Sequence, residues 1–314
     1  MNRTLALIAV ILAFIVVVMG AYVRLSDAGL GCPDWPFCYG RPVPADIADS
    51  HALVKAWKEM GHRYLAGTLG LLILALVVIA WWRVLFVQKS EGTGFALLAS
   101  GIAVVVVFQA TLGMWTVTML LKPAIVAAHL IGGMTTLALL ACLALAQWPH
   151  TTAPSMRALR PVAVLALAAV VVQIVLGGWV SANYAALACP EFPRCPGPMD
   201  FANAFHVVRE LGRTADGELL SLDALRAIHW AHRLFANVAL LLVLLAAWRT
   251  WRLERRLALL LGALVLAQFS LGVANVALSL PLPLAAAHNA GAALLLLSLV
   301  VLNFFAFRGL RPSW

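Results

Sequence analysis

The chain has 314 residues, of which 63% are apolar and only 11% are charged, and its mean hydropathy is +0.96. A water-soluble domain of this size needs far more surface charge, so the composition excludes that class of protein. The net charge of +9 comes from basic residues in short segments beside apolar runs, a pattern typical of membrane topology rather than of a nucleic-acid surface.

Eight apolar runs are each long enough to cross a bilayer as a helix. Lipid offers the backbone no hydrogen-bond partners, so each run must be helical. The first run is followed by no clear small-residue cleavage site and is expected to be retained rather than removed as a signal sequence. We therefore predict an all-α polytopic membrane protein with spans near 5–23, 62–84, 95–118, 124–147, 160–181, 226–248, 257–280 and 283–307.

The positive charge is distributed unequally across the membrane. If the termini and the even-numbered loops form one side, that side carries eleven basic and two acidic residues, whereas the other side is neutral. The positive-inside rule then predicts that both termini are cytoplasmic. The residues counted on the basic side are Arg3, Arg83, Lys89, Arg157, Arg160, Arg249, Arg252, Arg255, Arg256, Arg308 and Arg311, with Glu91 and Glu254 opposing them.

The two halves of the chain are copies of each other. The segments "CPDWPFC" and "CPEFPRC" share one pattern, and residues 109–133 align without gaps to residues 268–292. Each half holds four spans, an even number, so the copies share one orientation and are related by an axis along the membrane normal. We expect two tandem four-helix bundles, residues 1–150 and 151–314.

Four of the five cysteines lie in the two long outer loops. Cysteines gathered on the non-cytoplasmic side indicate disulfides in an oxidising compartment. The pairing that closes two small loops is Cys32 with Cys38 and Cys189 with Cys195.

Four histidines lie at similar depth, in the first two turns of the spans that enter from outside. A single intramembrane histidine usually forms an interhelical hydrogen bond, but four of them duplicated with the repeat indicate function. Two imidazoles facing each other across a bundle can hold haem iron axially, whereas zinc would need further ligands that neither half offers. The candidate ligands are His62, His129, His232 and His288.

Small and basic residues accompany these histidines. Gly132 and Gly291 each follow a histidine by three residues, where a missing side chain leaves room for a macrocycle or for close helix packing. Arg63 and Arg233 each follow a histidine directly and would either pair with haem propionates or reach lipid headgroups. Arg24, at the outer end of the first span, is a further propionate candidate.

The two halves differ at one position beside the histidines. In "EMGHR" and "IHWAHR", Glu59 falls opposite His229. Glu59 lies three residues before His62 and shares its helix face, so it is a candidate for general acid–base work, although an acid is also favoured in the first turn of a helix. His229 is either a hydrogen-bonding neighbour or an alternative iron ligand to His232.

The segments "GAYVRLSDAGLGCPDWPFCYG", "EMGHRYLAG", "AAHLIGG", "HWAHRLFA" and "AAHNAGA" together resemble the haem A synthase family, membrane enzymes that convert haem O to haem A for terminal cytochrome oxidases. The resemblance covers essentially the whole chain. It implies that one histidine pair holds the substrate haem O and the other a haem b (iron protoporphyrin IX) that relays electrons. These pairs are His62 with His129 and His232 with His288, respectively.

The resemblance also implies a reaction and a setting. A ring methyl group of haem O would be oxidised to a formyl group through hydroxylated intermediates, with Glu59 as the family's essential glutamate. The implied location is the inner membrane of a bacterium. Beyond haem O, an electron donor and the lipid bilayer, the resemblance allows haem O synthase, cytochrome oxidase assembly factors and a second copy of the chain as partners, and no nucleic acid.

Alternatives remain at this point. A di-haem b electron-transfer protein without substrate chemistry would carry the same histidines, a thiol oxidoreductase would use the cysteines, and a transporter is compatible with parallel repeats. Cys32 and Cys38 match outer-loop cysteines tied to reactivity in many family members. Their disulfide is either a static clasp over the pocket or a participant in thiol–disulfide chemistry.

Overall fold

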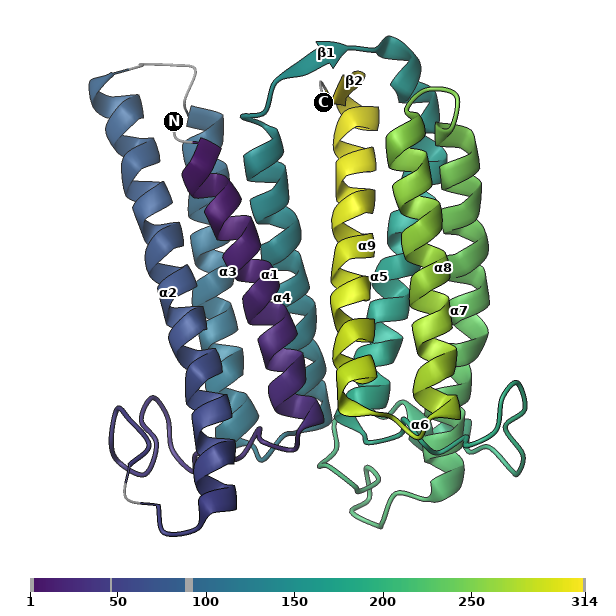
Figure 1. Cartoon of the computed structure of the whole chain (residues 1–314). Helices are drawn as coiled ribbons and strands as arrows, with labels where there is room; N and C mark the ends of the chain where they lie inside the picture. The colour runs from purple at the N-terminus through teal and green to yellow at the C-terminus, as the bar shows by residue number, and fades with distance from the viewer. Residues whose placement is uncertain (1–2, 46, 88–92, 313–314) are drawn as a thin grey trace. The chain divides into compact units, whose positions relative to one another are not determined.

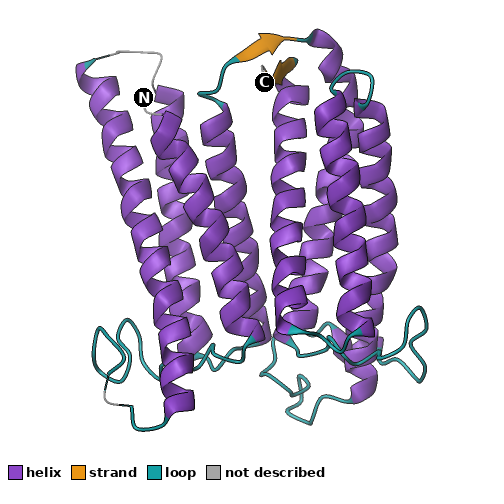
Figure 2. Ribbon diagram, viewed as in Figure 1, coloured by secondary structure: helices purple, strands orange, loops and turns teal. Residues whose placement is uncertain are grey.

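The computed structural model describes residues 3–45, 47–87 and 93–312, and these form almost entirely helices (Figure 1, Figure 2). Within those ranges, eight helices are long and apolar enough to cross a membrane. The expected all-α polytopic fold is confirmed. Lys89, Glu91 and the side chain of Arg311, which entered the charge count, lie outside what is described.

The helices follow the predicted spans with ends that differ by a few residues, except that α2 begins at Ser50 and not near residue 62. The candidate spanning helices are α1 (Arg3–Leu25), α2 (Ser50–Phe86), α3 (Thr93–Thr118), α4 (Pro123–Leu145), α5 (Arg160–Ala182), α7 (Leu222–Thr250), α8 (Arg255–Ala277) and α9 (Leu282–Arg308). The short elements are β1 (His150–Thr152), the 3-10 helix η1 (Pro154–Leu159), α6 (Phe201–Ala204) and β2 (Leu310–Pro312), with β1 and β2 paired antiparallel.

Capping residues explain where the helices begin and end. The Asp49 side chain accepts a hydrogen bond from the His51 N–H at the start of α2, and Ser221 accepts one from Ala224 N–H at the start of α7. These polar caps start both helices outside the apolar runs. At the other end of the chain, Gly309 adopts φ +64° and terminates α9, a conformation that glycine adopts without steric cost.

Two compact units can be distinguished. One comprises residues 1–118 and 132–149, in which α2 packs against both α1 and α3. The other comprises residues 119–131 and 150–314, in which α5 packs against α7 and α9 and α8 packs against the same two helices. Each is a helical bundle, and the expected division at residue 150 stays a prediction.

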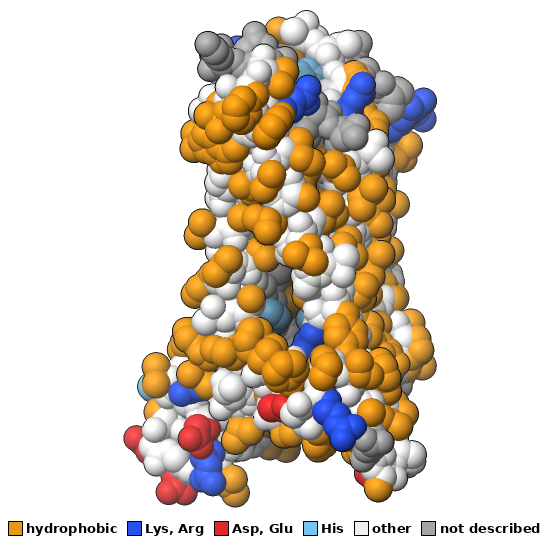
Figure 3. All heavy atoms as spheres, turned by 90° about the vertical axis from the view of Figure 1, so that its left-hand side faces the viewer, with side chains coloured by type: hydrophobic (Ala, Val, Ile, Leu, Met, Phe, Trp, Pro, Cys, Tyr) orange, Lys and Arg blue, Asp and Glu red, His pale blue; other side chains and the backbone are white. Residues whose placement is uncertain are grey.

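The outward surface of the first unit is that of a lipid-facing bundle. On the face drawn in Figure 3, hydrophobic side chains cover the middle, and the acidic side chains among the described residues gather at one end. Leu71 and Val78 of α2 and Val104 and Val107 of α3 are all strongly exposed. Water-exposed apolar surface on this scale is costly, whereas lipid accepts it.

Candidate functional site

Two predicted ligand histidines lie directly against glycines of a neighbouring helix. A Cβ atom added to Gly20 of α1 would lie 2.9 Å from Cε1 of His62 on α2. The repeat-related Gly177 of α5 stands in the same relation to His232 of α7, at 3.0 Å. Any larger residue would therefore push the imidazole away. Each of these glycines stands twelve residues before the first cysteine of its half, but nothing in that spacing indicates which side chain the glycine faces.

The fourth candidate, His288 of α9, has a similar setting. A Cβ atom on Gly272 of α8 would lie 3.2 Å from its Cε1. His129 lies on α4, and its side chain, like that of His288, is half-buried. Small residues thus leave space beside the imidazole in three of the four cases.

Glutamine amides approach both histidines of the second half. Nε2 of Gln173 lies 3.1 Å from Nδ1 of His232 and donates to the His232 carbonyl oxygen, also at 3.1 Å. Nε2 of Gln268 lies 3.4 Å from Nε2 of His288. Among the described residues, Oε1 of both glutamines and Nδ1 of His288 are buried without a hydrogen-bond partner. Such buried polar atoms are costly, so this cluster is suited to taking a polar or metal-containing group.

Glutamines also occupy the space beside the two glycines singled out in the sequence. A Cβ atom on Gly132 would collide with Gln109, and one on Gly291 would collide with Gln268. These glycines therefore admit an amide side chain, a neighbour that we did not expect from their spacing.

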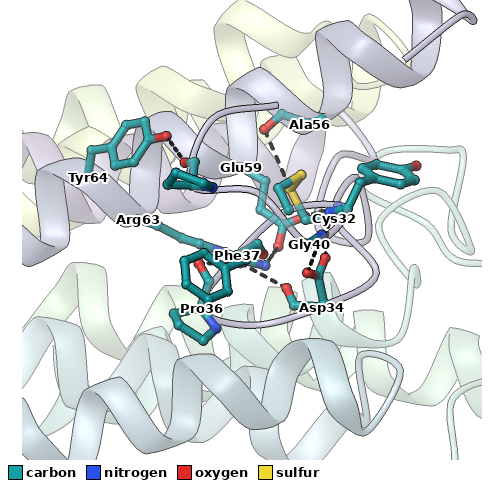
Figure 4. The surroundings of a disulfide bond; sticks show 12 residues. Cys32, Asp34, Pro36, Phe37, Gly40, Ala56, Glu59, Arg63 and Tyr64 are labelled. Carbon is teal, nitrogen blue, oxygen red and sulfur yellow. Dashed lines mark hydrogen bonds and ion pairs between the residues drawn. A yellow bond between two sulfur atoms is a disulfide. The ribbon is translucent and has the colours of Figure 1, made fainter. Parts of the chain in front are cut away.

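Glu59 lies buried beneath the loop that joins α1 to α2, with 4% of its surface exposed (Figure 4). Its Oε2 accepts a hydrogen bond from Cys32 N–H at 2.9 Å, and its Oε1 pairs with the Arg63 guanidinium. Because α2 begins at Ser50, Glu59 is not in the first turn. The interpretation of Glu59 as a residue that merely stabilises a helix start is wrong.

Both predicted disulfides, Cys32–Cys38 and Cys189–Cys195, are formed. We call residues 32–38 the first disulfide loop and residues 189–195 the second disulfide loop. In the first, both sulfurs are fully buried and pack against α2.

Asp34 stabilises the first disulfide loop from within. Its carboxylate accepts hydrogen bonds from Tyr39 N–H at 2.7 Å and from Gly40 N–H at 2.8 Å. The loop is therefore ordered both by its covalent bond and by backbone hydrogen bonds.

Arg63 and Arg233 hold the two disulfide loops to their helices. Nη1 of Arg63 donates to the carbonyl oxygens of Asp34 and Phe37, at 2.9 and 2.8 Å. In the second half, Arg233 donates to Glu191 O at 2.7 Å and to Cys189 O. The contact of Arg63 and Arg233 with loop carbonyls had no signal in the sequence, since any residue type supplies a carbonyl.

His229 occupies the place of Glu59 in the second half and is equally buried, with 4% of its surface exposed. Its Nε2 accepts a hydrogen bond from Nε of Arg233 at 3.0 Å. That lone pair is therefore engaged within the protein, whereas His232 lies between Gly177 and Gln173. Arg24, the last predicted site residue, lies in the final turn of α1 with a half-buried side chain.

One buried cation was missed by sequence reasoning. Arg209, in the segment between α6 and α7, is only 3% exposed, donates to Asn183 Oδ1 at 2.5 Å and lies over the Trp179 ring. Burial lowers the pKa of Arg209, but an arginine remains charged throughout the physiological range. Charged loop residues are usually exposed, so the sequence gave no reason to place this one inside.

Comparison with known proteins finds relatives along nearly the whole chain. A sequence model of the family described as "Cytochrome oxidase assembly protein" matches residues 3–300. A "Heme A synthase" of Shewanella oneidensis is 43% identical, with 95% of this chain and 94% of that protein aligned. Proteins of the same name from Chelativorans sp. and Alkalihalophilus pseudofirmus are 28% and 26% identical, over 96% and 88% of this chain and 90% and 88% of their own lengths.

Proposed function

The chain belongs to the cytochrome oxidase assembly protein family, and on that premise we propose that it is a haem A synthase, an enzyme of haem biosynthesis that acts on haem O. The finer proposal is that it is an oxidoreductase that converts a ring methyl group of haem O to a formyl group. The observation that carries it is the asymmetry between the two halves, in which a buried carboxylate, Glu59, stands where the other half has His229.

The second half is the proposed haem b site, and His232 and His288 would hold the haem iron there. The residues fit such a group, because two glycines let the imidazoles lie close against neighbouring helices and His288 Nδ1 is buried without a partner among the described residues. An iron-bound imidazole needs a partner for its other nitrogen, and Gln173 lies within hydrogen-bond distance of the ring of His232. When bound, haem b supplies one-electron transfer. Of the two neighbouring histidines, His232 is the proposed ligand because it aligns with His62 in the repeat, and Nε2 of His229 is engaged with Arg233.

The first half is the proposed substrate site, with His62 and His129 holding haem O. Oxidation of a methyl group releases protons as electrons leave, so a base must lie nearby. Glu59 shares helix α2 with His62, three residues away, and its oxygens are already oriented by Cys32 N–H and Arg63. We assign proton transfer to Glu59.

Three arginines remain candidates for the haem propionates: Arg24 and Arg63 at the substrate site and Arg233 at the haem b site. Arg63 and Arg233 already donate to loop carbonyls, so a propionate would use their remaining N–H groups. The proposed location is the inner membrane of a bacterium, with both termini cytoplasmic and the disulfide loops on the oxidising side. The proposed partners are haem O, an electron donor, haem O synthase and other cytochrome oxidase assembly factors.

Co-expression with a haem O source tests this proposal. Pigment extracted from the membranes should contain haem A when the parent chain is present. Glu59→Gln should leave haem O bound and reduce haem A by at least about a hundredfold, because it removes the acid–base group and keeps the shape of the side chain. A protein that binds haem and yields no haem A with Glu59 in place would instead be a di-haem electron carrier.

A further inference from the structure

The first disulfide loop is joined to α2 by two side chains that contact only its backbone (Figure 4). The Glu59 carboxylate accepts from Cys32 N–H at 2.9 Å, at the beginning of the loop. The Arg63 guanidinium donates to the carbonyls of Asp34 and Phe37, at 2.9 and 2.8 Å, in its middle and near its end. Since Glu59 and Arg63 also pair with each other, the loop and the carboxylate form one connected unit.

This pair is shielded from water, which makes its contacts stronger than those of a surface ion pair. The side chains of Arg63 and Glu59 are 13% and 6% exposed. Removing one member of a buried pair leaves an uncompensated charge, and hydrogen bonds to charged groups are stronger than neutral ones. The position of the Glu59 carboxylate therefore depends on Arg63 and on the closed loop together.

The second half shows which part of this arrangement is general. Arg233 donates to the carbonyl oxygens of Cys189, Glu191 and Arg194. It also donates to His229 and lies over the ring of Phe192. The arginine thus holds a disulfide loop whether or not a carboxylate is present. Only in the first half does it also fix a carboxylate.

We infer that Arg63 is a positioning residue that couples the closed Cys32–Cys38 loop to the orientation of Glu59. With the disulfide intact, Cys32 N–H and the two loop carbonyls keep their hydrogen bonds to Glu59 and Arg63. When the loop opens, the carboxylate loses its backbone donor and Arg63 loses its acceptors, so Glu59 is no longer held. This inference rests on the proposed role of Glu59 in haem O oxidation.

The rate at which each disulfide is reduced tests whether Arg63 holds the first disulfide loop closed, and this measurement needs no haem chemistry. The purified full-length chain is treated with a water-soluble phosphine for increasing times, alkylated, and analysed by peptide mass spectrometry for each cysteine pair. Arg63→Gln should accelerate reduction of Cys32–Cys38 by about tenfold or more and leave Cys189–Cys195 unchanged. Arg233→Gln should do the reverse. Each protein therefore contains its own control.

Two further variants distinguish loss of the Arg63 contacts from a general destabilisation of the loop and its surroundings. Tyr64→Phe removes a hydrogen bond from the adjacent residue to the carbonyl oxygen of Pro42, outside the disulfide ring, and should leave both rates unchanged. Arg63→Lys keeps the charge but lacks the planar fork, so its rate should lie between those of the parent and Arg63→Gln. Equal rates in the parent and Arg63→Gln, or equal acceleration of both pairs, would overturn the inference.

The coupling to Glu59 is tested by a double-mutant cycle on the same rates. Glu59→Gln should also accelerate reduction of Cys32–Cys38, and the double variant Glu59→Gln with Arg63→Gln should be no faster than the faster single variant. Additive effects on the reduction rate would mean that the two residues hold the loop independently, which would contradict the proposed coupling. Arg63→Gln should also lower the amount of haem A formed per bound haem O. If each arginine variant accelerates reduction of its own disulfide only, but no haem A is formed, the proposed function alone is contradicted. If haem A is formed, but the variants do not accelerate one disulfide selectively, this inference alone is contradicted.

Discussion

The outer ends of α2 and α7 are the most informative comparison in this molecule. Both helices begin at a polar cap, both bear a predicted ligand histidine next to an arginine, and both arginines donate to the carbonyls of a disulfide loop. They differ in the group beneath the loop, which is a carboxylate, Glu59, in one and an imidazole, His229, in the other. The two halves share the arginine contacts with a disulfide loop and differ in the titratable group beneath it, a difference that fits the proposed division of substrate chemistry from electron transfer.

Replacing Glu59 by the residue of the other half is the strongest way to break this comparison. Glu59→His makes the end of α2 resemble that of α7 and should abolish haem A formation, by about a hundredfold or more, because an imidazole does not reproduce the carboxylate. Pigment extraction from membranes supplied with haem O measures the effect. Glu59→Asp, which keeps the acid, should retain more activity than Glu59→His. The division of labour would be refuted by a Glu59→His variant that makes haem A normally.

The glycines against the imidazoles offer a matched pair of smaller changes. Gly20→Val and Gly177→Val each place side-chain atoms where a histidine ring now lies, at a cost of about 1–3 kcal/mol. We expect Gly20→Val to weaken binding at the first site and Gly177→Val at the second, and haem titration followed by absorbance distinguishes them. If both variants lost the same haem, the assignment of one site to each half would be contradicted.

A change at Gln173 tests the comparison between the two halves further, and its expected effect, on haem affinity, is the smallest. It lies four residues before Gly177, and Val16 stands four residues before Gly20 in the first half. Gln173→Val should therefore make the second site more like the first, and loss of a partner to a ligand histidine typically lowers metal affinity by about tenfold. Haem titration of the purified chain provides the measurement. An unchanged affinity would mean that Gln173 only packs against His232.

Sequence reasoning identified the eight spans, the repeat and both disulfides, because each depends on composition or on residues close together in the chain. It placed the start of α2 too late, near residue 62 and not at Ser50, since hydropathy detects apolar residues while the cap at Asp49 is polar. Helix boundaries depend on such local hydrogen bonds.

The tertiary contacts could not be predicted from the sequence, for a different physical reason. Arg63 and Arg233 donate to backbone carbonyls, which leave no trace in residue types. The repeat pointed to Gly20 and Gly177, but the imidazoles that they face come from a different helix. The site residues themselves were predicted from their types, and the contacts that position them only became visible in the fold.

The length of α2 has a consequence for where protons go. Its 37 residues correspond to about 55 Å, whereas the hydrocarbon of a bilayer is about 30 Å thick. Counted from Phe86, Glu59 stands about 40 Å along the helix. The length of α2 would therefore place the carboxylate beyond the hydrocarbon layer, where the first disulfide loop covers it. In the proposed reaction, protons released at Glu59 would leave on the aqueous side of the membrane nearest to the first disulfide loop and would not have to cross the lipid.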